Sequence, residues 1–302
     1  MKNQKSNITT FVSAAGLAFI LLLSGCSQDD APAPEDGTKD GNAIRFTSTI
    51  SHFTGDDIPG TRATIDPADG TGSFENGDET AIIVFDYTAL SAKDHAATYR
   101  NGAWATDMTW DEFKEGATVV FNAFFPKLSL NEFHEGRFYT ISPPTVQSTP
   151  EQYAAADWLH AVGGATVAES NQPVELPFRH IMHRLTVNLS LSGTPGTLTQ
   201  ADVDEATVVI KNMYTTGEVI AAGFFQYPAM TPTGEFTPLK SGTGNTFHVL
   251  LLPQNVTPGT PWIEITVAGK TVTYSVPDGL TKLQDGKEQV VNLKLTSSGA
   301  TG

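Results

Sequence analysis

Short apolar runs separated by turn-forming residues constrain this chain more than any other feature of its sequence. The runs are rich in β-branched and aromatic residues, and glycine, proline, asparagine or aspartate stands between them. Several alternate apolar and polar side chains, which is the period of a half-buried strand. The clearest runs are residues 44–50, 81–85, 117–125, 137–141, 185–191, 206–210, 247–252, 262–267, 270–276 and 289–295. This pattern predicts β-sandwiches, with a tight hairpin at Ala268-Gly269-Lys270.

Helix signals are scarce. Ser148 and Thr149 stand before Pro150, in the order of a helix cap followed by a first-turn proline, so we expect a short helix to run through Ala156. Residues 107–114 are expected to hold one further helical turn. Strands and helices do not alternate along the chain as they do in proteins with parallel sheets and crossover helices. The sequence therefore predicts an all-β fold with very little helix.

The N-terminus has the features of a bacterial lipoprotein signal. Two lysines precede an uncharged apolar stretch, residues 11–23, that is too short to span a bilayer comfortably. The small pair Ser24-Gly25 follows, and then Cys26, the single cysteine of the chain. A signal peptidase needs small residues before its cut, and a lipoprotein needs a thiol at its new N-terminus. We predict that residues 1–25 are a signal peptide and that Cys26 is lipidated. The alternatives are an ordinary secretory signal with a chance cysteine, or a buried free thiol.

Charge and cysteine content exclude several classes of function. The chain has 18 Lys and Arg against 33 Asp and Glu, a net charge of −15. Nucleic-acid binding needs clustered cations to replace the counterions of phosphate, so the sequence argues against it. Once Cys26 is modified, no thiol remains for a disulfide, a catalytic thiolate or a zinc site. No later apolar run approaches the roughly 20 residues of a membrane helix, so the lipid itself is expected to hold the protein to a membrane.

We divide the chain from Cys26 onward into three parts. Residues 26–42 are rich in aspartate, proline and glycine and are expected to form a flexible acidic tether. A stretch rich in glycine, alanine and asparagine, residues 163–173, precedes a fresh series of strand-like runs. We therefore place a boundary at residue 177. The expected domains are an N-terminal one over residues 43–177 and a C-terminal one over 178–302, each large enough for its own core.

No group of residues has the spacing of a metal, cofactor or catalytic site. His180 and His183 lie at the start of a strand, where residues three apart point to opposite faces, so their rings are expected to diverge. A set of carboxylates does not match the spacing of a calcium-binding loop: Asp66, Asp69, Asp78 and Glu79. Nucleophile elbows, phosphate-binding glycine loops and convincing pairs of carboxylates are also missing from the sequence. We therefore expect no metal, no cofactor and no enzymatic activity.

The aromatic residues Tyr99, Trp104 and Trp110 leave two interpretations open. They suit a surface platform on which sugars stack, and they equally suit core and edge positions around a hairpin that turns at Asn101-Gly102. We favour the second interpretation. The first gives an alternative function for the chain, a surface glycan-binding lipoprotein of the outer membrane that does not polymerise.

Several segments, taken in order, resemble the fimbrillin family of Bacteroidetes. After the lipoprotein signal these are residues 61–65, 73–78, 155–161, 174–185 and the pair Gly286-Lys287 before the last strand-like run. The early acids Asp29 and Asp30 resemble the acidic patch that directs lipoproteins of such bacteria to the outer face of the outer membrane, although a plain soluble spacer is the alternative. The resemblance implies two transthyretin-like β-sandwich domains in tandem. It also implies a structural or adhesive component of fimbriae, lipid-anchored at the cell surface.

The same resemblance implies a mode of assembly. In pilus-building members a trypsin-like protease cuts after a basic residue and removes the first strand, and a strand of the next subunit fills the groove. The matching positions here are Arg62 and Ala63 for the cut, residues 44–50 for the removed strand, and residues 289–296 for the donor strand, with Val291, Leu293 and Leu295 on one face. The partners would be other fimbrial subunits or further copies of this chain, besides a host or bacterial surface ligand. A solvated loop arginine and an ordinary core strand are the alternatives for these two segments.

Overall fold

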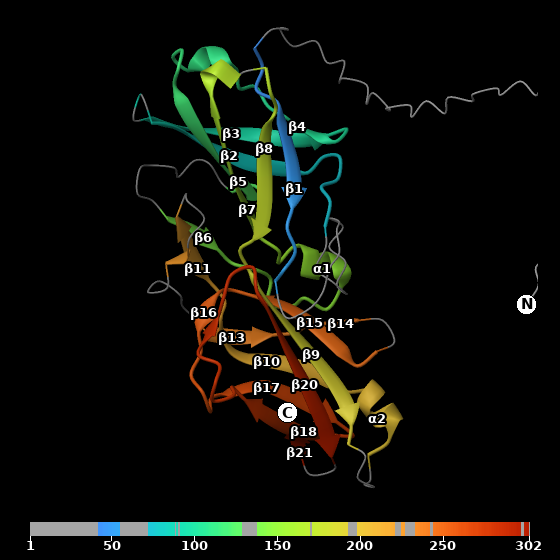
Figure 1. Ribbon diagram of the computed structural model, residues 1–302. Coiled ribbons are helices and arrows are strands. Elements are labelled where there is room, and N and C mark those ends of the chain that lie inside the picture. The colour runs from blue at the N-terminus through green and yellow to red at the C-terminus, as the bar shows by residue number, and fades with distance from the viewer. Residues whose placement is uncertain are drawn as a thin grey trace, which may run out of the picture. The chain divides into compact units, whose positions relative to one another are not determined.

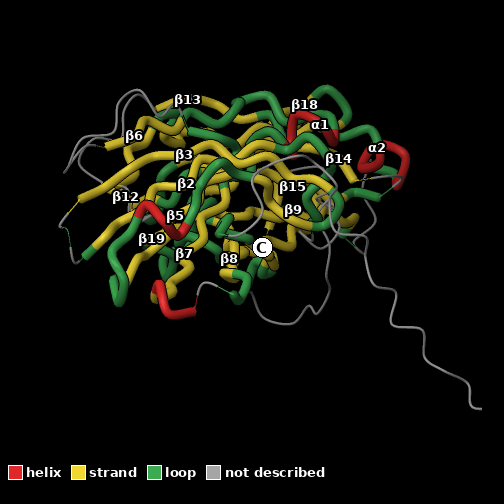
Figure 2. Tube along the Cα trace, turned by 90° about the horizontal axis from the view of Figure 1, so that it is seen from above, coloured by secondary structure: helices red, strands yellow, loops and turns green. Residues whose placement is uncertain are grey.

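The computed structural model describes residues 42–54, 72–87, 89, 91–128, 138–169, 171–192, 198–220, 225–226, 233–241, 244–296 and 299–301. The described residues belong to one compact unit, and most of their regular structure is β-strand (Figure 1; Figure 2). The helical elements are short: α1 (Pro150–Ala154), α2 (Gln200–Asp204) and the 3-10 turns Trp110–Glu112 and Val167–Glu169. The prediction of an all-β fold with very little helix is therefore confirmed.

Both α-helices begin at a threonine that forms a reciprocal capping box. Thr149 Oγ1 accepts a hydrogen bond from the backbone N–H of Gln152, whose side chain accepts one from the N–H of Thr149. Thr199 and Asp202 exchange the same two hydrogen bonds at the start of α2. The expected helix after Pro150 is present but ends at Ala154 instead of Ala156, and the expected turn within residues 107–114 is the 3-10 turn Trp110–Glu112. The second helix was not predicted, although its sequence carries the same capping pattern.

The N-terminal strands form one sheet that closes on itself. Its strands are β1 (Phe46–Ile50), β2 (Glu79–Asp86), β3 (Ser91–Arg100), β4 (Ala103–Ala105), β5 (Thr118–Phe125), β7 (Leu159–Thr166) and β8 (Val174–His180). The order is β1-β4-β3-β2-β5-β7-β8, and β1 then pairs with β8 to close the barrel. Neighbouring strands are antiparallel except at this closing pair, which is parallel. Figure 1 shows β1 and β8 side by side.

Large aromatic side chains fill the barrel. Phe46, Trp110 and Phe121 are buried, and the rings of Phe46 and Phe121 meet edge to face at 5.0 Å. Close approach of two strands is made possible by Gly163 on β7, where a Cβ atom would lie 2.6 Å from the carbonyl oxygen of Glu175 on β8. The seam between these strands therefore depends on a glycine within a strand.

Two sheets of the C-terminal half pack face to face as a sandwich. One has the order β13-β10-β17-β18 and the other β14-β15-β9-β20-β21. The strands are β9 (His183–Leu191), β10 (Thr207–Tyr214), β13 (Thr233–Phe236), β14 (Leu239–Ser241), β15 (Thr246–Leu251), β17 (Pro261–Val267), β18 (Lys270–Ser275), β20 (Glu288–Thr296) and β21 (Gly299–Thr301). Apolar side chains of both sheets share one core. The predicted hairpin is confirmed, because Ala268 and Gly269 turn with φ of 49° and 72° between β17 and β18.

The remaining strands form two small sheets. They are β6 (Phe138–Ile141), β11 (Gly217–Ile220) and β12 (Phe225–Gln226) in one, and β16 (Gln254–Asn255) and β19 (Lys282–Leu283) in the other. A third apolar cluster draws side chains from both strand systems, among them Ile83 of β2, Tyr153 of α1 and Leu250 of β15. The barrel and the sandwich therefore share buried contacts.

The arrangement as two tandem sandwiches is not confirmed, because the seven N-terminal strands form a closed barrel instead. Closure depends on the pairing of β1 with β8, which joins residues far apart in the sequence and leaves no local signal. The domain division at residue 177 stays a prediction. Strand β8 of the barrel runs from Val174 to His180 across that position, and β9 of the sandwich begins at His183.

Candidate functional site at the first strand

Strand β1 is held mainly from one side. All five of its residues pair with β8, from Phe46 with Val174 to Ile50 with Phe178, whereas only Phe46 pairs with Trp104 of β4. The inward side chains differ in burial: Phe46 is fully buried, but Ser48 and Ile50 are half-buried. Strand β1 therefore closes the barrel through one ladder of backbone pairs with β8 and through the buried ring of Phe46.

Polar contacts add to this seam. The indole N–H of Trp104 donates to the hydroxyl of Ser48 at 3.1 Å, and the N–H of Ile44 donates to the carbonyl of Met108 at 3.0 Å. Ile44 is itself buried, with 2% of its surface exposed. These contacts fix the register of β1, since Ser48 satisfies a tryptophan donor that would otherwise be buried without an acceptor.

The chain after β1 continues to the start of β20. Phe53 stacks on the ring of His180, with centroids 3.9 Å apart and planes 18° from parallel. The N–H of Thr54 donates to the carbonyl of Gly286 at 2.8 Å, and the N–H of Glu288 donates to the carbonyl of Thr54 at 3.2 Å. Residues 44–54, which we call the N-terminal segment, thus contact both the barrel and the strand predicted to be the donor.

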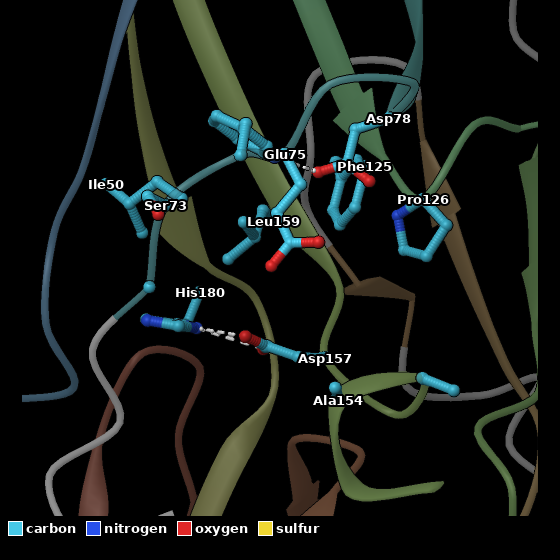
Figure 3. A pocket seen from close by; sticks show the side chains of 13 residues that line it. Ile50, Ser73, Glu75, Asp78, Phe125, Pro126, Ala154, Asp157, Leu159 and His180 are labelled. Atoms are coloured by element: carbon cyan, nitrogen blue, oxygen red, sulfur yellow. Dashed lines mark hydrogen bonds and ion pairs between the residues drawn. The ribbon is translucent and has the colours of Figure 1, made fainter. Parts of the chain in front are cut away.

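A cavity of about 330 Å³ opens beside the end of β1 (Figure 3). Its walls are mostly apolar, with Ile50 of β1, Phe125 and Leu159 among them. One end holds Asp157 and His180, whose Nδ1 lies 2.8 Å from a carboxylate oxygen in a pair that is 1% exposed on both sides. Because Ile50 forms one wall, removal of β1 would open this cavity.

An acidic edge completes the cavity. Glu75 and Asp78 lie there, and the carboxylate of Asp78 accepts a hydrogen bond from the N–H of Glu75 at 2.8 Å. Burial raises the pKa of Asp78 above its ordinary value, and the hydrogen bond from Glu75 opposes part of this shift. The cavity combines apolar walls with acidic groups, which suits an inserted segment better than it suits catalysis.

The predicted site residues fall into two groups. Cys26, Arg62 and Ala63 lie outside the described residues. Val291, Leu293 and Leu295 lie on one face of β20, and 7%, 0% and 0% of their surfaces are exposed. They point into the core of the sandwich, where β20 lies between β9 and β21. The three side chains share one face, as the alternation in the sequence indicates, and in this structure that face belongs to the core of their own sandwich. Their role as a donor strand stays a prediction.

The histidines and carboxylates form no metal site within the described part of the chain. The expectation that both histidines lie at the start of one strand is wrong, because His180 ends β8 and His183 begins β9. His180 binds Asp157, whereas Nδ1 of His183 contacts the carbonyl of Gln284 at 2.9 Å, so the two rings have different partners. Asp66 and Asp69 of the carboxylate set lie outside the described residues, and Asp78 and Glu79 lie near the start of β2.

The aromatic residues do not form an exposed platform. Trp104 and Trp110 have 2% and 1% of their surfaces exposed, and Tyr99 packs against the same core. Asn101 and Gly102 make the turn, with φ of 49° and 88°. The interpretation as core and hairpin aromatics is therefore confirmed, and the sugar-stacking interpretation of these residues is wrong because neither indole face is accessible.

A buried polar cluster was missed from the sequence. Arg184 is 1% exposed and contacts Glu288 at 3.4 Å, and it donates from Nη2 to Nδ1 of His248 at 3.2 Å. Thr186 donates to Glu288 at 2.6 Å. Burial, and secondarily the charge of Arg184, lowers the pKa of His248 to about 3. The sequence signal for this cluster is the presence of charged residues within otherwise apolar strand runs.

A profile of the fimbrillin-like family matches residues 61–302. None of the curated proteins compared with this chain matches it. No helix among the described residues is both long and apolar enough to cross a membrane.

Solved structures share the fold. A candidate cell adhesion protein from Bacteroides ovatus aligns with a TM-score of 0.63 at 16% identity, over 86% of this chain and 95% of its own. One from Bacteroides uniformis aligns with 0.59 at 19% identity, over 89% and 96%. One from Bacteroides thetaiotaomicron aligns with 0.51 at 17% identity, over 83% and 92%. At such identities the likeness concerns the fold.

Proposed function

The chain belongs to the fimbrillin-like family, and we propose on this basis that it is a structural or adhesive subunit of fimbriae at the cell surface. In this proposal Cys26 carries the lipid that anchors the subunit to the outer membrane. A protease cuts between Arg62 and Ala63, β1 leaves the barrel, and a strand of the next subunit takes its place. The role is mechanical and involves no chemical catalysis.

The observation that carries this proposal is the way β1 closes the barrel. Its single ladder with β8 comprises five residue pairs, and Arg62 follows this strand in the sequence. Loss of the strand would leave groups of β8 without partners, including the N–H of Val174 and the carbonyl of Phe178. It would also uncover the space filled by Phe46. An unpaired edge beside an apolar slot is the kind of surface that binds an added strand.

The chemistry of β20 suits that vacant position. Val291, Leu293 and Leu295 alternate along the strand as Phe46, Ser48 and Ile50 do along β1. Strand β20 runs parallel to β9, as β1 runs parallel to β8. A β20 segment from another subunit would therefore present three apolar side chains to the barrel in a direction the edge of β8 already accepts.

The N-terminal segment also links the two strands. Thr54 exchanges hydrogen bonds with Gly286 and Glu288, at the beginning of β20. Release of residues up to Arg62 would break both hydrogen bonds, so processing would change the surroundings of the donor strand together with those of the groove.

Limited trypsin digestion tests this proposal. The soluble protein would start at residue 26 with Cys26→Ser, and the products would be run on a gel without boiling. We expect a cut after Arg62, identified by a new N-terminus at Ala63, followed by a ladder of stable oligomers. The matched variant Arg62→Gln should give neither that N-terminus nor the ladder.

Cleavage at this position without oligomers would contradict strand exchange while leaving processing intact. Resistance of the native protein near Arg62, under conditions that cut unfolded protein, would contradict processing by a trypsin-like enzyme.

A further inference from the structure

The cavity beside the end of β1 is acidic. Its volume of about 330 Å³ lies within the range of small-molecule sites. Glu75, Asp78 and Asp157 line it, and its described lining contains no lysine or arginine. The one other ionisable side chain of that lining is His180, which contacts Asp157 at 2.8 Å. A cavity lined by carboxylates in this way attracts cations and repels anions.

Asp78 is the carboxylate best placed to meet a ligand. It is half-buried, whereas the side chain of Asp157 is 1% exposed and already paired with His180. The carboxylate of Asp78 accepts a hydrogen bond from the backbone N–H of Glu75 at 2.8 Å, and no cationic side chain of the described residues pairs with it. Burial raises the pKa of Asp78, the hydrogen bond from Glu75 opposes part of this rise, and the charge of Glu75 adds to it. A cation bound at Asp78 would offset both the burial and the repulsion.

Most of the remaining wall of the cavity is apolar. Phe74 and Phe125 line it with their rings edge to face, at 5.2 Å between centroids. Ile50 and Leu159 add aliphatic surface, and in Figure 3 Asp78 lies above Leu159 at the upper end of the cavity. Alkyl groups gain free energy when they leave water for such walls, and aromatic rings also attract organic ammonium ions. The cavity therefore offers an apolar surface and a carboxylate to the same ligand.

We infer that this cavity binds a small organic ammonium ion, with the ammonium group at the carboxylate of Asp78 and the alkyl group against Phe125 and Leu159. A metal ion does not suit the site, because metal ions need several converging donor side chains and the described residues provide no such group. A neutral apolar molecule would leave the carboxylate of Asp78 without a cation, and an anionic ligand would be repelled. An alkylamine meets both requirements of the cavity, because it joins an apolar chain to a cation that donates hydrogen bonds.

This inference goes beyond the proposed fimbrial function and does not depend on lipidation, cleavage or strand exchange. Ile50 of β1 forms one wall of the cavity, so the ligand would bind the protein in which β1 is in place. The uncleaved Arg62→Gln variant should therefore bind the amine as well as the unaltered sequence does. Binding by a protein that is never cut, or cutting of a protein that binds no amine, would separate the two proposals.

Isothermal titration calorimetry tests the inference on the protein from residue 26 with Cys26→Ser and Arg62→Gln. Hexylammonium chloride is the probe. Hexanol and sodium hexanoate are the comparisons, since they have the same chain length but are neutral and anionic. We expect saturable binding of hexylammonium, at least about tenfold tighter than that of hexanol, and no detectable binding of hexanoate.

Two substitutions locate the ligand, and circular dichroism checks that each variant is folded. Asp78→Asn removes the charge but keeps an oxygen that accepts the N–H of Glu75, so it should weaken hexylammonium binding about tenfold. Ala155→Trp places a large side chain at an exposed position that lines the cavity, so it should abolish binding without disturbing the core. The matched control is Asp94→Asn, which removes the same charge from an exposed position of β3 outside the cavity and should leave binding unchanged.

Four outcomes would overturn the inference. Undetectable hexylammonium binding at millimolar concentration would exclude the ligand. Equal binding of hexanol would indicate an apolar cavity without a role for the carboxylate. Unchanged binding by Asp78→Asn or by Ala155→Trp would place the site elsewhere on the molecule. An equal loss of binding in Asp94→Asn would indicate attraction to the net charge of the protein instead of a defined site.

Discussion

Strands β1 and β20 lie near opposite ends of the described chain and have the same direction relative to their neighbours, but they are held very differently. Each is parallel to the strand beside it, β8 for β1 and β9 for β20. The ladder of β1 has five residue pairs and its other edge pairs at one residue. The ladder of β20 has eight pairs, and β21 covers its other edge.

The inward side chains of the two strands also differ in how deeply they are buried. The apolar inward side chains Val291, Leu293 and Leu295 of β20 are buried, whereas in β1 only Phe46 is fully buried and a serine occupies the next inward position. Since burial of apolar surface contributes most to the free energy of folding, β20 is an integral part of its sandwich, whereas β1 contributes less buried surface to its barrel. Donation of β20 to another subunit would therefore require the donor's sandwich to lose a buried strand, whereas β1 could leave its barrel at a smaller cost.

The largest effect is expected from Leu293→Asp on β20. The substitution buries a carboxylate among apolar side chains, so we expect a loss of more than about 4 kcal/mol of unfolding free energy, measured by urea titration with circular dichroism. The control is Val290→Asp on the outer face of the same strand, where 41% of the valine surface is exposed. A comparable loss in both variants would show that β20 has no distinct buried face.

A smaller and local effect is expected from Phe46→Ala on β1. Truncation of a buried phenylalanine removes about 3 kcal/mol or more of stability, and hydrogen exchange should accelerate in β8 and β4 but not in β9. Thr47→Ala, at an exposed position of the same strand, should leave exchange unchanged. Faster exchange throughout the sandwich after Phe46→Ala would mean that β1 is not replaceable independently.

Acid should affect the sandwich more than the barrel. Burial lowers the pKa of His183 to about 4 and of His248 to about 3 in the sandwich, and that of His160 to about 3 in the barrel. Between the unfolded pKa of about 6.5 and these values, the unfolded chain binds protons that the folded chain does not. Unfolding free energy therefore falls as pH is lowered, by up to about 1.4 kcal/mol per pH unit for each histidine.

Urea titrations between pH 7 and 5 check this dependence. His160→Gln should remove only the barrel's share of the slope, which is one histidine of the three. A stability that is constant over this range would contradict burial of the neutral rings.

The two hairpin turns should give the smallest and opposite effects. Both place a residue other than glycine at φ of 49°, asparagine at 101 in the barrel and alanine at 268 in the sandwich. Asparagine tolerates this left-handed conformation better than alanine does. We expect Ala268→Asn to raise the free energy of unfolding by about 1 kcal/mol and Asn101→Ala to lower it by about 1 kcal/mol. The melting temperature should shift in the same directions. A lower melting temperature for Ala268→Asn would contradict the turn geometry.

Local patterns made most of the strands predictable. The β-branched runs at residues 81–85 and 262–267 lie within β2 and β17, and alternation at residues 289–295 lies within β20 with the expected buried face. The asparagine-glycine and alanine-glycine turns also follow from sequence, because few residues adopt positive φ.

Strands that break these patterns were not predictable. Strand β7 contains Gly163 and Gly164, which resemble a loop in sequence, yet Gly163 is needed for close contact with β8. Pro177 lies within β8, where a proline is uncommon, so this strand carries no clear signal in the sequence. The backbone groups of Val174 and Phe178 form hydrogen bonds with the N-terminal segment. Because backbone groups of alternate residues face the same neighbouring strand, the nitrogen of Pro177 faces away from β1, and its lack of an N–H costs no hydrogen bond to that strand.

The candidate site was predictable only in part. The role of residues 44–50 as a first strand follows from their alternation, but its partner β8 does not. The cluster of Arg184, Thr186, His248 and Glu288 combines residues from β9, β15 and β20, which no local spacing brings together.

Replacement of β1 by a β20 segment is the central claim, and peptide binding tests it most directly. A synthetic peptide of residues 288–296 would be added to protein cut after Arg62 and to intact Arg62→Gln protein, and complexes would be measured by native mass spectrometry. We predict a one-to-one complex with the cut protein only, abolished when Val291, Leu293 and Leu295 of the peptide are replaced by serine. Equal binding to the intact protein, or no complex with protein shown to have lost residues up to Arg62, would contradict the claim.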